Sequence, residues 1–214
     1  MVEEEILLQQ LFDEEKLTDK QKKILLAAID TFSEKGYAAT STSEIAKKAG
    51  VAEGTIFRHY KTKKELLVSI VTPLISKVFG PFIVRDFHKV LDQPYENAED
   101  FIRATIENRR EVFKKLLPVI KIIMQEIPFQ PELREQFVEQ VAKKTYERIL
   151  VVIQNYQDKG QIIDIPPSSV ARLAVSSIFG YLISRYILFP ESEWDDELET
   201  ERTVQFILHG IGKK

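Results

Sequence analysis

The stretch that decides the fold runs from residue 41 to residue 66 and reads STSEIAKKAGVAEGTIFRHYKTKKEL. Ser41 is followed three positions later by Glu44, a capping-box spacing that predicts the start of a helix. Gly50 ends this helix after about eight residues, and a second short helix is expected at 53–59. Two helices this short cannot bury enough apolar surface to be stable alone, so they must pack on another helix. The pattern predicts a helix-turn-helix.

The helix on which they pack is expected just before them. Thr18 and Gln21 form a second capping-box spacing, and Gly36 is a typical helix terminator, so a helix is predicted at 19–35. Its large apolar residues recur at helical spacing and form one stripe. That stripe can supply the surface that the two short helices lack.

The rest of the chain shows apolar spacings of three and four and no sustained alternation, which predicts an all-α fold of about nine to ten helices. Thr62 with Glu65 opens the fourth helix, Pro73 is expected to kink it, and Gly80-Pro81 to break it. Further helices are expected at 82–91, 98–115, 118–127, 132–157, 169–188 and 195–210. We expect two domains, a helix-turn-helix domain at 16–63 and a larger helical domain at 64–214.

The composition is that of an ordinary globular protein, with 44% hydrophobic and 29% charged residues, and it excludes disordered or collagen-like chains. There is no cysteine, so disulfides, thiolate metal sites and cysteine nucleophiles are excluded. The longest unbroken apolar run, Ile24–Ile29, is far shorter than a bilayer span, and the acidic N-terminus does not resemble a secretory leader. We expect no membrane segment and a cytoplasmic location.

The net charge of −3 conceals a basic segment. Residues 16–66 hold eleven Lys or Arg against six Asp or Glu, whereas residues 1–15 hold six acids and no base. A basic segment suits a polyanion, because phosphate contacts release counterions. Many charged stretches are only solvated surface, so charge alone does not decide the partner.

The second short helix has one face suited to DNA. Ile56 and Tyr60 lie four positions apart and are expected to face the protein interior. The residues left for a major groove are Glu53, Thr55, Arg58 and His59. Arg58 has the geometry to pair with guanine, and the lysines at 61, 63 and 64 are placed to hold phosphate.

At these residues the chain resembles the tetracycline-repressor (TetR) family of transcriptional regulators. The resemblance rests on Thr55–Leu66, TIFRHYKTKKEL, and on the spacing of Ser41, Glu44 and Gly50 before it, and it covers about residues 18–67. It implies DNA-facing positions at Ser43, Thr55, Phe57, Arg58, His59 and Lys63, with Gly54 letting the backbone approach a phosphate. It also implies a divergent C-terminal domain that binds a ligand and dimerises through its last two helices.

Two positions depart from the family pattern. Phe57 stands where the family usually has a tyrosine, so a hydroxyl bond to phosphate is absent. Ala52 stands where a serine commonly caps the recognition helix, which forfeits a side-chain cap of about 0.5–2 kcal/mol.

A pocket for a small-molecule effector is expected among the middle helices, because apolar concave sites commonly form between bundle helices. Candidate lining residues mix aromatic, flexible and polar side chains, although each is equally typical of core: Phe101, Met124, Gln125, Phe129, Tyr146, Tyr156 and Phe179. Glu126 would suit a cationic ligand if it is buried, and Arg103, Arg109 or Arg110 an acidic one.

A homodimer interface is expected on the last two helices, as the resemblance implies. The apolar candidates, which are also typical of plain core, are Phe179, Gly180, Tyr186, Val204, Ile207 and Leu208.

Enzyme chemistry finds no support in the sequence. Neither a GxGxxG nor a phosphate-binding loop is present, and the histidines at 59, 88 and 209 show no metal-ligand spacing, so we expect no catalytic residue, metal or cofactor. The sequence predicts a homodimeric repressor that a lipophilic small molecule releases from a palindromic double-stranded DNA operator. A non-specific DNA-organising protein and a helical protein–protein adaptor remain the alternatives.

Overall fold

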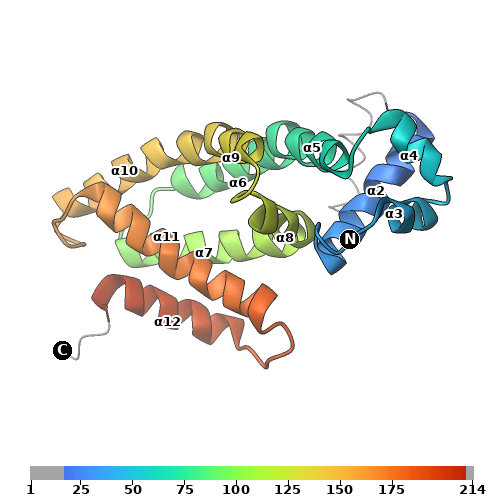
Figure 1. The fold of residues 1–214 in the computed structure, drawn as a ribbon. Helices are drawn as coiled ribbons and strands as arrows, with labels where there is room; N and C mark the ends of the chain where they lie inside the picture. The colour runs from blue at the N-terminus through green and yellow to red at the C-terminus, as the bar shows by residue number, and fades with distance from the viewer. Residues whose placement is uncertain (1–16, 211–214) are drawn as a thin grey trace. The chain divides into compact units, whose positions relative to one another are not determined.

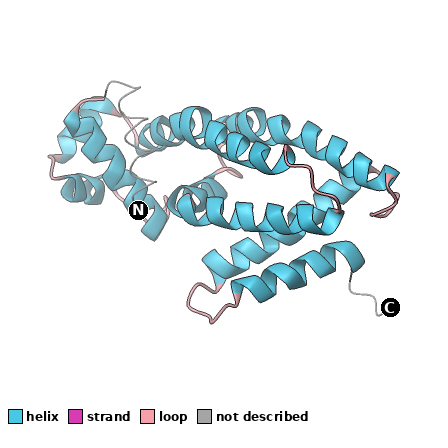
Figure 2. Cartoon of the chain, turned by 180° about the vertical axis from the view of Figure 1, so that it is seen from behind, coloured by secondary structure: helices cyan, strands magenta, loops and turns pink. Residues whose placement is uncertain are grey.

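The computed structural model describes residues 17–210, and within that range every regular element is a helix (Figure 2). Two π-helical turns, η1 and η2, join neighbouring segments and a third, η3, extends α11, so this part of the chain forms nine continuous helices. The all-α prediction is therefore confirmed.

The helical segments follow one another along the chain with short connections (Figure 1). Their bounds are α2 (Asp19–Lys35), α3 (Thr42–Ala49), α4 (Glu53–His59), α5 (Lys63–Pro73), η1 (Leu74–Phe79), α6 (Gly80–Leu91), α7 (Ala98–Lys115), α8 (Leu117–Glu126), α9 (Pro131–Phe137), η2 (Val138–Ala142), α10 (Lys143–Asp158), α11 (Pro167–Ile183), η3 (Ser184–Leu188) and α12 (Asp196–His209). The ends of α2 and α3 are those predicted from caps and terminators, and α4 and α7 span the expected ranges.

The expected break at Gly80-Pro81 is wrong, because the chain stays helical from Lys63 to Leu91. In η1 the N–H of Gly80 donates to the carbonyl of Ile75, five residues back. This wider turn shifts the hydrogen-bond register by one residue, which lets a helix accommodate proline instead of ending at it.

The continuous helix Lys63–Leu91 is long and apolar enough to cross a membrane by length and composition, although it contains no long unbroken apolar run. Core helices of soluble proteins have the same property. Here Leu66, Leu67 and Ile70 are buried inside the protein, which accounts for part of its apolar character.

The chain divides by its contacts into two compact units. The first comprises the chain up to Phe82 together with Lys115–Ala142, and the second comprises Ile83–Lys114 and the chain from Lys143 onward. In the first unit α2 packs against α3, α5 and α8, and α5 packs against α9. In the second unit α11 packs against α10 and α12.

Candidate nucleic-acid interface

The helix-turn-helix begins with a complete capping box. The hydroxyl of Ser41 accepts from the N–H of Glu44 at 3.2 Å, and the Glu44 carboxylate accepts from the N–H of Ser41 at 3.0 Å. The helix ends at Gly50, whose φ of +67° is left-handed and whose N–H donates back to α3. Only glycine takes this conformation without strain, so Gly50 sets the tight turn into α4.

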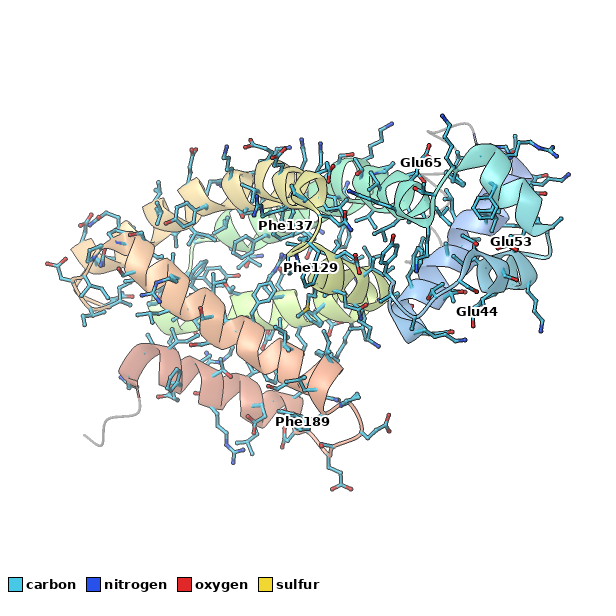
Figure 3. All side chains as sticks on the ribbon, in the orientation of Figure 1. Glu44, Glu53, Glu65, Phe129, Phe137 and Phe189 are labelled. Carbon is cyan, nitrogen blue, oxygen red and sulfur yellow. The ribbon has the colours of Figure 1, made fainter. Side chains whose placement is uncertain are left out.

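The start of α4 is held from α3 and not by its own cap. Ala52 makes no side-chain cap bond, as predicted. The hydroxyl of Thr42 donates to the Glu53 carboxylate at 2.6 Å and links the first turns of the two helices. Figure 3 shows Glu53 on α4 and Glu44 on α3. Glu53, which would repel phosphate, therefore has a structural partner.

An ion pair fixes the other side of the helix-turn-helix. Lys35, the last residue of α2, donates to Glu44 at 2.7 Å. The N–H and the hydroxyl of Ser41 also donate to this carboxylate. Together with the bond from Lys35 they lower the pKa of Glu44 to about 2, and the Lys35–Glu44 bond raises the pKa of Lys35. One carboxylate thus caps α3 and ties it to α2.

The two faces of α4 are as predicted. Ile56 and Tyr60 are buried, whereas Phe57, Arg58 and His59 are exposed. Phe57 is 47% exposed, which is costly for a ring that has no partner. On the same part of the unit Ser43 and Gly54 are also exposed and Thr55 is half-buried.

The ammonium of Lys63 already has hydrogen-bond partners within the protein, unlike that of a lysine free to bind phosphate. Its ammonium donates to the carbonyls of Tyr37 at 2.7 Å and Thr40 at 2.8 Å, and it lies 4.4 Å from the centre of the Tyr37 ring. The side chain therefore holds the turn before α3 in place. Lys61 and Lys64 are exposed next to it.

The second unit contains an apolar cavity of about 120 Å³ between its helices. Of the predicted effector-binding residues, Phe101 and Tyr156 line it, with ring centres 5.7 Å apart. Its other lining residues are Phe87, Ala98, Ile102, Thr105, Ile149, Ile153, Ile162, Ile163, Val170, Ala171, Ala174, Val175, Ile178, Ile207 and Leu208. The helical stripes were visible in the sequence, but nothing in them distinguishes cavity wall from solid core.

The other predicted effector-binding residues lie elsewhere. Tyr146 and Phe179 are exposed and do not line this cavity, and Met124 is exposed on α8 in the first unit. Gln125 and Phe129 line a separate open depression in that first unit.

The three arginines suggested for an acidic ligand have partners within the second unit. Arg103 pairs with Glu201 at 2.8 Å, which raises its pKa. Arg109 lies 3.6 Å from Asp86, and its burial lowers its pKa to about 10. Arg110 donates to the carbonyl of Asp196 at 2.9 Å. These contacts hold α7 to its neighbours.

The residues predicted for the dimer interface differ in how exposed they are. Phe179 and Gly180 are exposed on α11, whereas Val204 is 0% exposed and belongs to the core of its own chain. Ile207 and Leu208 line the cavity. Tyr186 is half-buried, with its hydroxyl lacking a hydrogen-bond partner among the described residues.

Residues 24–70, which span this helix-turn-helix, match the family of bacterial regulatory proteins called tetR. The helix-turn-helix region of this chain belongs to the TetR family. Members of the TetR family are regulators and not enzymes. Separately, no group of three His, Asp or Glu residues within residues 17–210 could hold a metal ion.

Proteins similar in sequence include three from Bacillus subtilis. The chain is 29% identical over 167 residues to the uncharacterized HTH-type regulator YvkB, a match spanning 77% of this chain and 82% of YvkB. It is 41% identical over 66 residues to the fatty acid metabolism regulator protein, but this covers 31% of the chain and 32% of that relative. The match to the uncharacterized regulator YerO spans 57% of YerO.

Solved structures share the fold at low identity. The transcriptional regulator FadR from Bacillus subtilis, in complex with stearoyl-CoA, has a TM-score of 0.63 and 20% identity over 89% of this chain and 98% of that chain. The TetR-family regulator PfmR from Thermus thermophilus has a TM-score of 0.67 and 20% identity over 89% and 99% of the two chains.

Proposed function

We propose that this TetR protein is a homodimeric repressor, released from a palindromic operator when a lipophilic molecule enters its C-terminal domain. The observation that carries the proposal is the apolar cavity in a chain whose N-terminal region is a TetR helix-turn-helix. In functional terms residues 16–63 form the DNA-binding domain and residues 64–214 bind the effector and the second subunit. Because its target is DNA, the protein acts in the cytoplasm.

The exposed face of α4 reads the operator. Thr55 and Arg58 make the base contacts, and Arg58 pairs with a guanine. Phosphate and backbone contacts come from Ser43, Gly54, Phe57, His59 and Lys63. Lys63 acts from the start of α5, with its ammonium beside the turn before α3, where it already binds backbone carbonyls. Two copies of α4 enter successive major grooves about 34–36 Å apart, so the operator has matching two-fold symmetry.

A second subunit covers exposed apolar side chains on the last helices. A monomer that left them in water would carry an apolar patch of the kind that marks an interface. They are Leu173, Val175, Phe179, Leu188, Phe189, Leu198 and Phe206. Phe179 and Gly180 lie in this region of α11, and the interface extends to Tyr186.

The effector carries a fatty acyl chain. Two similar proteins support this class: one is named a fatty acid metabolism regulator, and the other was solved in complex with stearoyl-CoA. The cavity walls here are almost entirely hydrocarbon. An apolar cavity of about 150 Å³ accepts benzene, so a long chain needs more room. A neighbouring hollow of about 210 Å³ provides the additional volume. It shares four lining residues with the cavity: Ile163, Val170, Ala174 and Ile207.

Release follows only if the effector binds the DNA-free conformation more tightly than the DNA-bound one. We therefore propose titrating acyl-CoA thioesters of increasing chain length into a fluorescent protein–operator complex and following anisotropy. The proposal expects operator release by long chains and not by CoA alone. A thioester that binds tightly but leaves operator affinity unchanged would refute this route of induction.

A further inference from the structure

A second hollow lies in the first unit, where the end of α8 meets the turn between α2 and α3. It is an open depression lined by two stretches of chain, residues 34–39 and residues 125–130. Its wall contains two carboxylates, one ammonium, two amides and two aromatic rings: Glu34, Glu126, Lys35, Gln125, Gln130, Tyr37 and Phe129. None of these residues belongs to the apolar cavity of the second unit.

Glu126 is the unusual member of this wall. It is only 7% exposed, yet no described residue donates a hydrogen bond to its carboxylate or forms an ion pair with it. A carboxylate this little exposed has given up much of its hydration, and within the described chain no hydrogen bond or ion pair replaces it. Tyr37 and Glu126 line the same depression, and the pKa of Tyr37 is raised by burial and then by the negative charge of Glu126.

Other groups around the depression favour positive charge. Gln130 is nearly buried, and its amide oxygen has no hydrogen-bond partner among the described residues. The amide oxygen of Gln125 lies 3.0 Å from the position that a Cβ on Gly36 would take, so it too borders the turn. The C-terminal ends of α2 and α8, where helix carbonyls carry partial negative charge, both border the hollow.

The nearby lysines are occupied. Lys35 is bound to Glu44 at 2.7 Å, and Lys63 is held by the carbonyls of Tyr37 and Thr40. Neither lysine forms an ion pair with Glu126. Among the residues described, the one ammonium in the wall, that of Lys35, is therefore bound to Glu44, and no lysine or arginine pairs with Glu126.

Phe129 adds an apolar surface. It lies in the turn between α8 and α9 (Figure 3) and is 76% exposed, an unusual position for a phenylalanine. An aromatic ring beside a carboxylate suits an organic cation, which gains from both the charge and the ring face. A metal ion would need several carboxylates or imidazoles, and no group of three such side chains exists in the described part of the chain.

We propose that this depression binds a small organic cation, an alkylammonium or guanidinium compound, with its charge on Glu126 and its apolar part against Tyr37 and Phe129. The site is separate from the cavity proposed for the acyl effector. Cation binding at this site can be measured without DNA. A negative result would therefore contradict this proposal without contradicting the proposed repressor function.

Calorimetric titration of the full-length protein tests the site, with choline, phenethylammonium and guanidinium as probes and the uncharged tert-butyl analogue of choline as the neutral control. We expect one saturable site per chain for the cations and binding of the neutral analogue at least about tenfold weaker. Glu126→Gln keeps the shape but removes the charge and should weaken choline binding about tenfold or more. The matched control Glu135→Gln removes an exposed carboxylate of α9 and should leave binding unchanged.

A second variant keeps the test valid if Glu126→Gln folds poorly. Phe129→Ala changes an exposed ring and should weaken choline binding several-fold without loss of stability. Absence of saturable binding by every cation would overturn the proposal, as would choline binding that Glu126→Gln leaves intact.

Discussion

The hydroxyl of Thr42 donates a hydrogen bond to the carboxylate of Glu53 at 2.6 Å and so joins the first turn of α3 to the first turn of α4. Because Ala52 provides no side-chain cap, this bond is the side-chain contact that fixes the start of the recognition helix. A residue whose charge opposes phosphate is therefore retained for the geometry of the helix that carries Arg58.

Loss of this bond should loosen α4. We expect Thr42→Val and Glu53→Gln each to lower the free energy of unfolding by about 0.5–1 kcal/mol, because the bond is solvent-exposed. The double variant should lose little more than either single variant. Urea unfolding of the four proteins measures the coupling, and purely additive losses would show that the two side chains do not act together.

Arg58 is expected to read sequence. Arg58→Ala should weaken binding to the selected operator by about 1–3 kcal/mol and relax the preference at one base pair of each half-site. Arg85→Ala, an exposed arginine of α6, serves as the control and should bind as the parent does. Binding to operator and scrambled duplexes at fixed salt distinguishes the cases. An equal loss on both duplexes would mean that Arg58 contacts only phosphate.

The helix-turn-helix could be predicted from sequence because its signals are local. Ser41 and Glu44 cap α3, Gly50 ends it, and each acts within a few residues. The continuity of the helix through Gly80-Pro81 could not be predicted. A π-turn is a shift in the backbone hydrogen-bond register, and no single residue type indicates where it occurs.

Acid should weaken the link between α2 and α3. The pKa of Glu44 is about 2 in the folded protein against an ordinary value of 4.5, so the unfolded chain binds protons more readily between these values. The stability that Glu44 contributes is present above pH 4.5 and is lost as the pH falls toward 2. Unfolding measured from pH 6 to pH 3 should show a steeper loss in the parent than in Glu44→Gln. Parallel curves for the two proteins would contradict this role.

Filling the apolar cavity should block the effector. Ala174→Leu adds hydrocarbon to a wall shared by the cavity and its neighbouring hollow. We expect acyl-CoA binding to weaken about tenfold or more, with operator affinity unchanged when no effector is present. Asn155→Leu, on the exposed face of α10, is the control for added bulk. Calorimetry with a long-chain thioester measures both variants, and unchanged binding in Ala174→Leu would place the effector elsewhere.

The residues that line the hollows were harder to predict than the exposed face of α4. Phe101 and Tyr156 could be chosen because aromatic residues stand out, but Ile153 and Ala174 look like any core residue in a helical stripe. Lys63 belongs to the DNA-facing pattern, yet the structure shows its ammonium bound to the turn before α3. These outcomes depend on contacts between distant segments, which spacing within one helix does not reveal.

The most direct test of the repressor account is selection of a random duplex pool on the purified protein at near-physiological salt, followed by sequencing of the bound fraction. The account predicts an enriched inverted repeat whose half-sites lie about one helical turn apart. A retained pool without enrichment would indicate a non-specific DNA-organising protein, and a pool that is not retained would indicate a protein–protein adaptor. Either result would contradict specific recognition by a dimer.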